Sequence, residues 1–480
     1  MTSSKALKLM LLQLMTICIY LLASHFTLGR ASPSDISLPV IKDPGLKAEI
    51  VLYGLDHPTQ MAFLSPADFL VIEKNSGKVI RVINDTALSR PLIDVKVANK
   101  IERGLLGLAV SKNLNTVSDS DDEKNKFETK IYLFYTESDK DGNDVCPTYS
   151  TCESEPEGNR LYRYDLERNR LVNQKLLLDI PGTRGPDHVG GVIKIGPDNN
   201  IYLASGDGDS CPNIGLCTKN DLEGRVLKSQ TSNVPDGLPP AGRGGILRVT
   251  PDGKPVNGGI IGNNNPLNKY YAYGIRNSFG MDFDPVTGKL WDTENGPFFG
   301  DEINLVDEGF NSGWLKVQGM WPVATFNPHA YPNPKYRGYI VNDPLNKDLK
   351  FDPRQLVDFN QNGVYSWPEF VWNRTVAPTG LLFLNTDKLG KQYKNDLLVG
   401  ESNTGTILHF ELNKNRTALD LSGPLSDKIA NSMDELEQIK FGEDFGVITD
   451  LKIGPDGYLY VLSYDRGMVY RVIPSAIYTQ

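Results

Sequence analysis

A histidine beside an acid, followed directly by two glycines, is the most chemically suggestive segment of this 480-residue sequence. Asp187 and His188 precede Gly190 and Gly191, and two apolar segments joined by a Pro-Asp turn follow, ending in a glycine-acid loop at 206–209. Imidazole titrates near neutral pH, and glycines allow a ligand to approach the backbone. His188 is therefore a candidate general base at the rim of a hairpin. A surface-loop histidine without a chemical role is the alternative.

A second suggestive segment packs three carboxylates and a Gly-Pro pair into nine residues. Glu294, Asp301 and Glu302 offer hard oxygen ligands, and Gly296 and Pro297 offer backbone carbonyls, a combination that suits Ca²⁺. An apolar strand pattern resumes immediately afterwards, which favours a metal site. A solvated acidic turn is the alternative.

Repeated hairpins are the elements that must position these residues. An apolar strand, a Pro-Asp or Asp-Gly turn and a second apolar strand recur at six places. These are 61–73, 192–203, 281–291 and 451–462, with partial copies at 131–164 and 395–410. Small antiparallel sheets repeated around an axis remove exposed sheet edges, so the pattern predicts an all-β fold, a six-bladed β-propeller with long inserted loops. A β-sandwich array is the alternative architecture.

The propeller predicts where the chemistry would gather, because loops that connect blades converge on the axis. Four segments would meet at one mouth: 102–107, 187–191, 274–280 and 294–302. The run 467–472 would close the ring against the first strands of the domain.

Composition supports a single closed domain and excludes one class of partner. The 45 glycines and 31 prolines are scattered, which indicates many turns and few long helices. A net charge of -9 excludes nucleic acid as a partner, because phosphate binding needs a concentrated basic face.

Residues 1–32 differ from the rest of the chain. Two lysines precede the apolar run 9–23, and small and polar residues follow. This pattern is typical of a secretory signal peptide or an uncleaved N-terminal anchor, so we expect an extracytoplasmic protein, secreted or held at the outer face of the membrane by this segment alone. A linker at 33–45 and the propeller domain at 46–475 follow.

Cysteine spacing agrees with export. Cys146 and Cys152 form one pair, and Cys211 and Cys217 form a second pair with the same spacing and the same Cys-Pro start. Two short disulfide-closed loops are the simplest interpretation. A zinc site built from all four is the alternative, although the CxxC spacing of zinc ribbons is absent.

A spaced set of motifs resembles the soluble quinoprotein glucose dehydrogenase and sorbosone dehydrogenase family, also called aldose sugar dehydrogenases. The motifs are DHVGG, IGPDNNIYLASGDGD, YGIRNSFGMDFDP, ENGPFFGDEINLV, GFNSGW and WNRTVAPTG, and the similarity extends from about Leu46 to Val472. The resemblance implies a six-bladed propeller that binds pyrroloquinoline quinone (PQQ) and calcium. It also implies oxidation of the C1 hydroxyl of an aldose or a related sugar or alcohol, and an external electron acceptor.

The resemblance also implies roles for individual residues. His188 matches the general base that takes the sugar hydroxyl proton while hydride passes to the quinone, and Asp187 matches the acid that orients this base. Arg276 and Asn277 match a pair that contacts the quinone oxygens and stabilises negative charge there. Glu102 matches a Gln or Glu beside the cofactor and the substrate.

Metal ligands are implied in the same way. Gly296 and Pro297 match backbone carbonyl ligands of the calcium that also holds the cofactor. Glu294, Asp301 and Glu302 match the carboxylates of a neighbouring calcium site.

Three positions depart from the family pattern. Asn403, Val447 and Thr449 align with a Lys and two Arg that hold the carboxylates of PQQ in the family. Burying three carboxylates without cations is costly. Either Arg184 or Arg103 compensates, or the pocket holds a different cofactor, or the protein is a non-enzymatic calcium-containing propeller that binds a glycan or a protein partner.

Overall fold

The computed structural model describes residues 37–112, 129–139, 156–183, 185–208, 229–297, 299–322 and 353–475. Strands dominate these ranges, and the helical segments in them are short 3₁₀ turns such as Met433–Ile439. Residues Leu38–Gln480 form one compact unit, to which all of the described strands belong.

None of the helices in the ranges given above is both long and apolar enough to span a membrane.

Within the described residues, the strands form six larger sheets and one two-stranded ribbon of β20 (Val317–Gln318) and β21 (Trp321–Pro322). The first sheet contains β3 (Pro58–Ser65), β4 (Asp68–Glu73), β5 (Lys78–Ile83), β6 (Thr86–Ala87) and β7 (Ile93–Asp94). The second contains β8 (Leu105–Lys112), β9 (Thr129–Glu137), β10 (Gly158–Glu167) and β11 (Arg170–Ile180). The third contains β12 (Gly190–Ile195), β13 (Ile201–Ser205), β14 (Gly245–Val249), β15 (Tyr270–Tyr273), β19 (Phe310–Asn311) and β22 (Val364–Tyr365).

The remaining three sheets complete the unit. The fourth contains β16 (Ser278–Phe283), β17 (Leu290–Glu294), β18 (Asp301–Val306), β23 (Phe370–Trp372) and β27 (Ile429–Ala430). The fifth contains β24 (Pro378–Phe383), β25 (Leu397–Glu401), β26 (Ile407–Phe410), β28 (Lys440–Glu443) and β1 (Val40–Ile41). The sixth contains β29 (Ile448–Ile453), β30 (Leu459–Ser463), β31 (Met468–Pro474) and β2 (Leu46–Tyr53).

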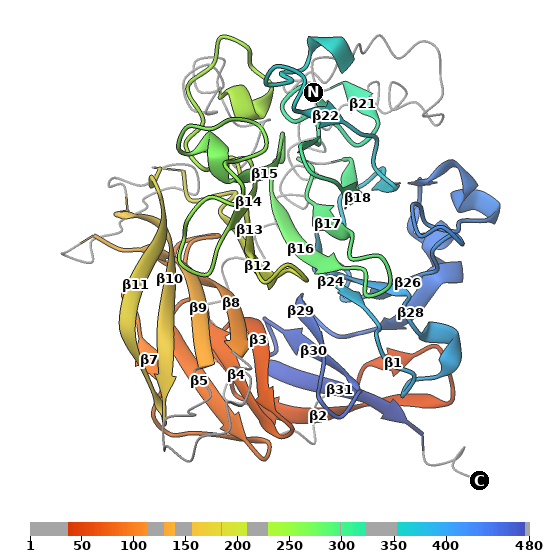
Figure 1. Ribbon diagram of the computed structural model, residues 1–480. Helices are drawn as coiled ribbons and strands as arrows, with labels where there is room; N and C mark the ends of the chain where they lie inside the picture. Colours follow the sequence, from red (N-terminus) through yellow and green to blue (C-terminus); the bar gives the residue numbers. More distant parts are fainter. Residues whose placement is uncertain are drawn as a thin grey trace, which may run out of the picture. The chain divides into compact units, whose positions relative to one another are not determined.

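The inner strands of these sheets contact one another in a closed circle. β3 contacts β8, β8 contacts β12, β12 contacts β16, β16 contacts β24, β24 contacts β29, and β29 returns to β3 (Figure 1). Sheets that pack around an axis through their inner strands form a β-propeller. The prediction of an all-β propeller is therefore confirmed.

The predicted hairpins form because their turns carry the right side chains. Between β12 and β13, the carboxylate of Asp198 accepts the Asn200 N–H at 3.1 Å and the Tyr202 hydroxyl at 3.0 Å. The turn between β29 and β30 repeats this arrangement, since Asp456 accepts the Tyr458 N–H at 3.1 Å and the Tyr460 hydroxyl at 2.9 Å. Aspartate accepting a backbone N–H two residues ahead closes a turn locally, so the Pro-Asp signal in the sequence had a physical cause.

The two ends of the domain pair in one sheet. β2 is antiparallel to β31, and the register runs from Leu46 opposite Pro474 to Tyr53 opposite Met468. The predicted closure of the ring by the C-terminal run is therefore confirmed.

Packing between adjacent sheets fixes the inner strands. Apolar side chains fill the space between neighbouring sheets, as Trp291 and Phe370 do with Phe383 and Val399. Buried polar side chains add direct links between inner strands: Gln60 of β3 accepts the Leu108 N–H at 2.7 Å, and Asp450 of β29 accepts the Met61 N–H at 2.9 Å. The ends of the inner strands are thus rigid supports for side chains at the mouth.

Candidate active site

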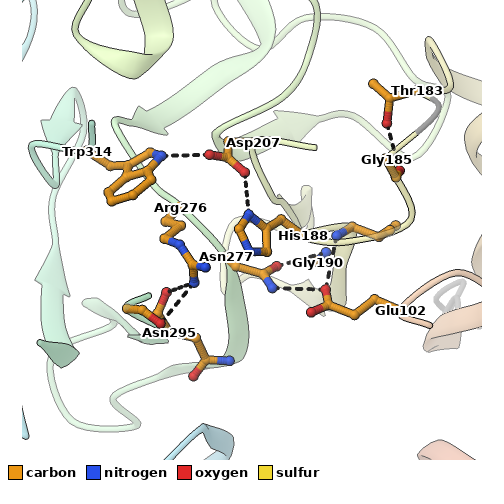
Figure 2. Close-up of polar contacts among 12 residues, drawn as sticks. Glu102, Thr183, Gly185, His188, Gly190, Asp207, Arg276, Asn277, Asn295 and Trp314 are labelled. Carbon is orange, nitrogen blue, oxygen red and sulfur yellow. Dashed lines mark hydrogen bonds and ion pairs between the residues drawn. The ribbon is translucent and has the colours of Figure 1, made fainter. Parts of the chain in front are cut away.

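The predicted site segments converge at the N-terminal ends of three neighbouring inner strands. Glu102 precedes β8, His188 precedes β12, and Arg276 and Asn277 precede β16. Asn277 links all three, because its Oδ1 accepts the Gly190 N–H at 3.1 Å and its Nδ2 donates to Glu102 Oε2 at 3.0 Å (Figure 2). The predicted convergence of these segments is confirmed.

Asp207 provides a carboxylate that contacts His188, and the sequence analysis had not named it; the acid predicted to orient His188 is the adjacent Asp187. His188 Nδ1 lies 2.7 Å from Asp207 Oδ1, and both side chains are at most 5% exposed. Asp207 follows β13, the hairpin partner of β12, and the Gly208 N–H donates to the His188 carbonyl at 3.1 Å. The hairpin therefore brings together residues 19 positions apart. Asp187 is also buried.

Asp207 is an ionised carboxylate held from two sides. Its Oδ2 accepts the indole N–H of Trp314 at 2.6 Å, on the opposite side from His188. Burial raises the pKa of the Asp207 carboxyl, but the charge and hydrogen bond of His188, the charge of Arg276 and the Trp314 N–H outweigh burial and leave that pKa below its ordinary value. A carboxylate only accepts hydrogen bonds, so His188 donates from Nδ1, and when the ring is neutral its lone pair is on Nε2.

Arg276 lies in the same site, with one buried donor that has no hydrogen-bond partner. Its Nη1 donates to the carbonyls of Asn295 and Gly296 at 2.7 and 3.0 Å, while its guanidinium lies over the Trp314 ring at 5.5 Å from the centroid. Its Nε makes no hydrogen bond although it is buried. An unsatisfied buried donor is costly, and an oxygen of a bound ligand would satisfy it.

The acidic segment after β17 is buried, so the alternative of a solvated turn is wrong. Glu294, Asp301 and Glu302 are at most 1% exposed. Glu294 and Glu302 are opposite each other on β17 and β18, and the Ser312 hydroxyl is 2.6 Å from Glu294 Oε2 and 3.2 Å from Glu302 Oε2. Burial, and then the charge of Asp292, raises the pKa of Glu294 to about 8. Burial, and then the charge of Glu294, raises the pKa of Glu302 well above its ordinary value.

Two of the predicted calcium residues have partners within the protein. Asp301 Oδ1 accepts the Gly296 N–H at 2.8 Å, and its Oδ2 accepts the Thr375 hydroxyl and the N–H groups of Val376 and Ala377. Asp301 thus holds two loops together. The Gly296 carbonyl accepts from Arg276, and in the described ranges no three His, Cys, Asp or Glu side chains gather as a metal site.

One buried acid was missed by the sequence analysis. Asp292 lies two residues before Glu294 on the same face of β17, and neither of its carboxylate oxygens accepts a hydrogen bond. Burial raises its pKa to about 7. Alternation along the strand, with acids at positions 292 and 294, was the available signal.

The three departures from the family pattern remain neutral positions in the structure. Asn403 is exposed, the Val447 N–H donates to Asp465, and the Thr449 hydroxyl donates to the Pro58 carbonyl at 3.0 Å. The described residues therefore fit the reacting end of a quinone cofactor, through Arg276 and Asn277, and these three positions offer no cation to its carboxylates.

Several predicted features fall elsewhere. Arg103 is buried, and its guanidinium donates to the Thr183 carbonyl. Arg184, the leader and the cysteine pairs Cys146–Cys152 and Cys211–Cys217 lie outside the described residues.

Comparisons with known proteins agree on one family. The chain is 25% identical over 451 residues to the aldose sugar dehydrogenase YliI of Escherichia coli, covering 92% of this chain and 94% of that protein. It is 26% identical over 340 residues to quinoprotein glucose dehydrogenase B of Acinetobacter calcoaceticus, covering 67% and 60%.

Solved structures show the same fold. The apo form of the soluble aldose sugar dehydrogenase from Escherichia coli aligns with a TM-score of 0.60 at 22% identity, covering 90% of this chain and all of that one. The PQQ-bound aldose sugar dehydrogenase from Streptomyces coelicolor aligns with a TM-score of 0.55 at 20% identity, covering 91% and 100%. The family model described as glucose/sorbosone dehydrogenase matches residues 55–325 and 346–471, and the chain belongs to that family.

Proposed function

We propose that the protein is a PQQ-dependent dehydrogenase that oxidises the C1 hydroxyl of an aldose or a related sugar or alcohol. The observation that carries the proposal is the buried His188–Asp207 pair, which shares one site with the partly unsatisfied guanidinium of Arg276. A mere binding surface has no chemical need for an oriented base facing a cation. The names of the relatives, aldose sugar dehydrogenase and quinoprotein glucose dehydrogenase, support the same reaction class.

The site residues have two roles: His188 and Asp207 handle the proton, and Arg276 and Asn277 stabilise negative charge. PQQ, when bound, supplies a quinone that accepts two electrons as hydride from the sugar. His188 takes the hydroxyl proton at Nε2, and Asp207 stabilises the imidazolium that results. Arg276 and Asn277 donate hydrogen bonds where negative charge grows on a ligand oxygen. The C1–H and O–H bonds break and a C=O bond forms.

The proposal has three further parts: the protein is exported, it binds a calcium ion, and each of its six larger sheets is one propeller blade. The leader pattern supports an extracytoplasmic location. The two unsatisfied oxygens of Asp292 beside Glu294 support a cation in the fourth sheet. The circle of inner strands supports six blades.

A non-enzymatic propeller is the second candidate. Neutral residues at Asn403, Val447 and Thr449 favour it, because the three carboxylates of PQQ would find no cation there. A glycan or protein partner without such charges would bind at the same mouth.

Titration with PQQ decides between the two candidates. Purified, calcium-loaded protein should change the absorbance of added PQQ and then reduce an artificial dye with one or more aldoses. A folded protein that does neither overturns the dehydrogenase proposal.

A pair of histidine variants tests the base. His188→Gln should lower turnover by about 10³-fold or more and leave PQQ affinity nearly unchanged. His409→Gln is the matched control, because His409 Nε2 also pairs with a carboxylate, Asp396 Oδ2 at 2.8 Å, away from the site residues. Equal turnover in His188→Gln and His409→Gln would remove His188 from the mechanism.

A further inference from the structure

Trp314 has a buried side chain that contacts both Asp207, the partner of the proposed base, and Arg276. Its indole N–H donates to Asp207 Oδ2 at 2.6 Å, and its ring face lies under the guanidinium of Arg276, 5.5 Å from the centroid (Figure 2). It is 2% exposed. One side chain thus links the carboxylate behind the base to the cation that would face the substrate oxygen.

The backbone of Trp314 is fixed on both sides. Its N–H donates to the Gly274 carbonyl at 2.9 Å, and its carbonyl accepts Asn233 Nδ2 at 2.7 Å. Asn233 is fully buried and exchanges two hydrogen bonds with the side chain of Asn311. The backbone of Trp314 is therefore fixed, and its ring is held by burial and by its own contacts with Asp207 and Arg276.

We propose that Trp314 is a positioning residue that fixes the orientation of the Asp207 side chain, and through it the hydrogen bond that orients the ring of the base. The inference rests on the proposed role of His188 as proton acceptor. With Oδ2 bound to the indole N–H, Oδ1 takes the proton on Nδ1 of His188, and the lone pair is left on Nε2. The cation–π contact with the Trp314 ring also holds the guanidinium of Arg276 in place.

If Trp314 orients Asp207, an Asp207→Asn variant should change the tautomer of His188. A tryptophan that only fills space would not cause this change. In Asp207→Asn the new side chain has one oxygen and one NH₂ group. If Trp314 fixes the orientation, the amide oxygen faces the indole N–H and the NH₂ group faces His188. Nδ1 must then accept, and the proton moves to Nε2. Without such control the amide rotates, its oxygen faces Nδ1, and the tautomer is unchanged.

Nitrogen-15 NMR of the histidine rings reads the tautomer directly, without cofactor or substrate. The chain has five histidines, and His188→Gln identifies the signal of interest by its loss. At a pH where the ring is neutral, the wild type should carry its proton on Nδ1, and Asp207→Asn should carry it on Nε2. The double variant Asp207→Asn, Trp314→Phe should return it to Nδ1. An unchanged tautomer in folded Asp207→Asn overturns the proposal.

Single variants of two tryptophans keep the test decisive if Asp207→Asn does not fold. Trp314→Phe removes the N–H and keeps an aromatic ring. The Asp207 carboxylate still accepts from Nδ1, so the tautomer should stay, but the Nδ1 signal of His188 should shift because one oxygen of Asp207 has lost its donor. Trp372→Phe is the matched control, since Trp372 is also buried and donates its indole N–H to a buried carboxylate, Glu401 Oε1 at 3.1 Å. It should leave the His188 signals unchanged. His188 signals that are identical in wild type and folded Trp314→Phe overturn the proposal.

Turnover gives a second readout that depends on the proposed reaction. Trp314→Phe should lower kcat by about 10- to 100-fold and change KM by less than about threefold, because the base is affected more than binding. Absence of turnover in the wild type would refute the dehydrogenase function. The NMR experiment would still decide the role of Trp314.

Discussion

Glu401 makes the stability of the fifth sheet depend on pH. It is fully buried at the end of β25, where Oε1 accepts the Trp372 indole N–H at 3.1 Å and Oε2 accepts the Thr404 hydroxyl. Burial raises the pKa of its carboxyl from 4.5 to about 7, even though both hydrogen bonds favour the ionised form. The folded protein therefore holds this proton more tightly than the unfolded chain does.

The sign and the size of the effect follow from that difference. Below pH ~4 the carboxyl is protonated in both states, and its contribution to stability is complete. As pH rises through about 7 the folded protein must ionise a buried group, and the contribution is lost. A pKa difference of this size corresponds to about 3 kcal/mol of unfolding free energy.

Glu401→Gln removes the titration and keeps a group of the same shape. Urea unfolding of wild type and variant at several pH values between about 4 and 8 gives the difference in unfolding free energy at each pH. Other titrating groups cancel in that difference. The unfolding free energy of the variant, relative to that of the wild type, should rise by about 3 kcal/mol from pH ~4 to pH ~8. Parallel pH profiles for the two proteins would refute the assigned burial and charge state of Glu401.

Three further perturbations test the site. Asp301→Ala should lower the unfolding free energy by about 3 kcal/mol or more, measured by urea unfolding, because three N–H groups and a hydroxyl lose their acceptor; a loss below about 1 kcal/mol would contradict its anchoring role. Chelation should lower Tm by several degrees, and Asp292→Asn should weaken that response in differential scanning fluorimetry; equal responses would place the cation elsewhere. Asn277→Ala should reduce dye turnover about tenfold or more, because Glu102 and Gly190 lose their common partner; full turnover would exclude it from the site.

The repeat explains why the fold could be predicted from the sequence. The Pro-Asp turns at Asp198 and Asp456 are each closed by their own aspartate, so the signal and its cause lie within a few residues. Alternation on either side then fixes the strands. The pairing of β2 with β31 was also predictable, because a ring of sheets needs both ends of the chain.

The contacts inside the site were harder to predict, because they join residues distant in sequence. The family resemblance and the adjacent position suggested Asp187 as the acid that orients His188, whereas the hairpin also brings Asp207 to this histidine. The Asp207–Trp314 hydrogen bond spans 107 positions, and no local pattern encodes it. The carbonyl of Gly296 illustrates the same limit of sequence reasoning, since its partner Arg276 comes from a different loop.

The pairing of β2 with β31 also governs how the ring can come apart. Hydrogen bonds between the first and last strands of the domain cannot form until nearly the whole chain is available, so ring closure is a late, high-contact-order event. Removing β31 would expose the edges of β2 and β30 at once, giving two open templates for intermolecular pairing. A chain shortened by its final strand should therefore aggregate rather than survive as a smaller propeller.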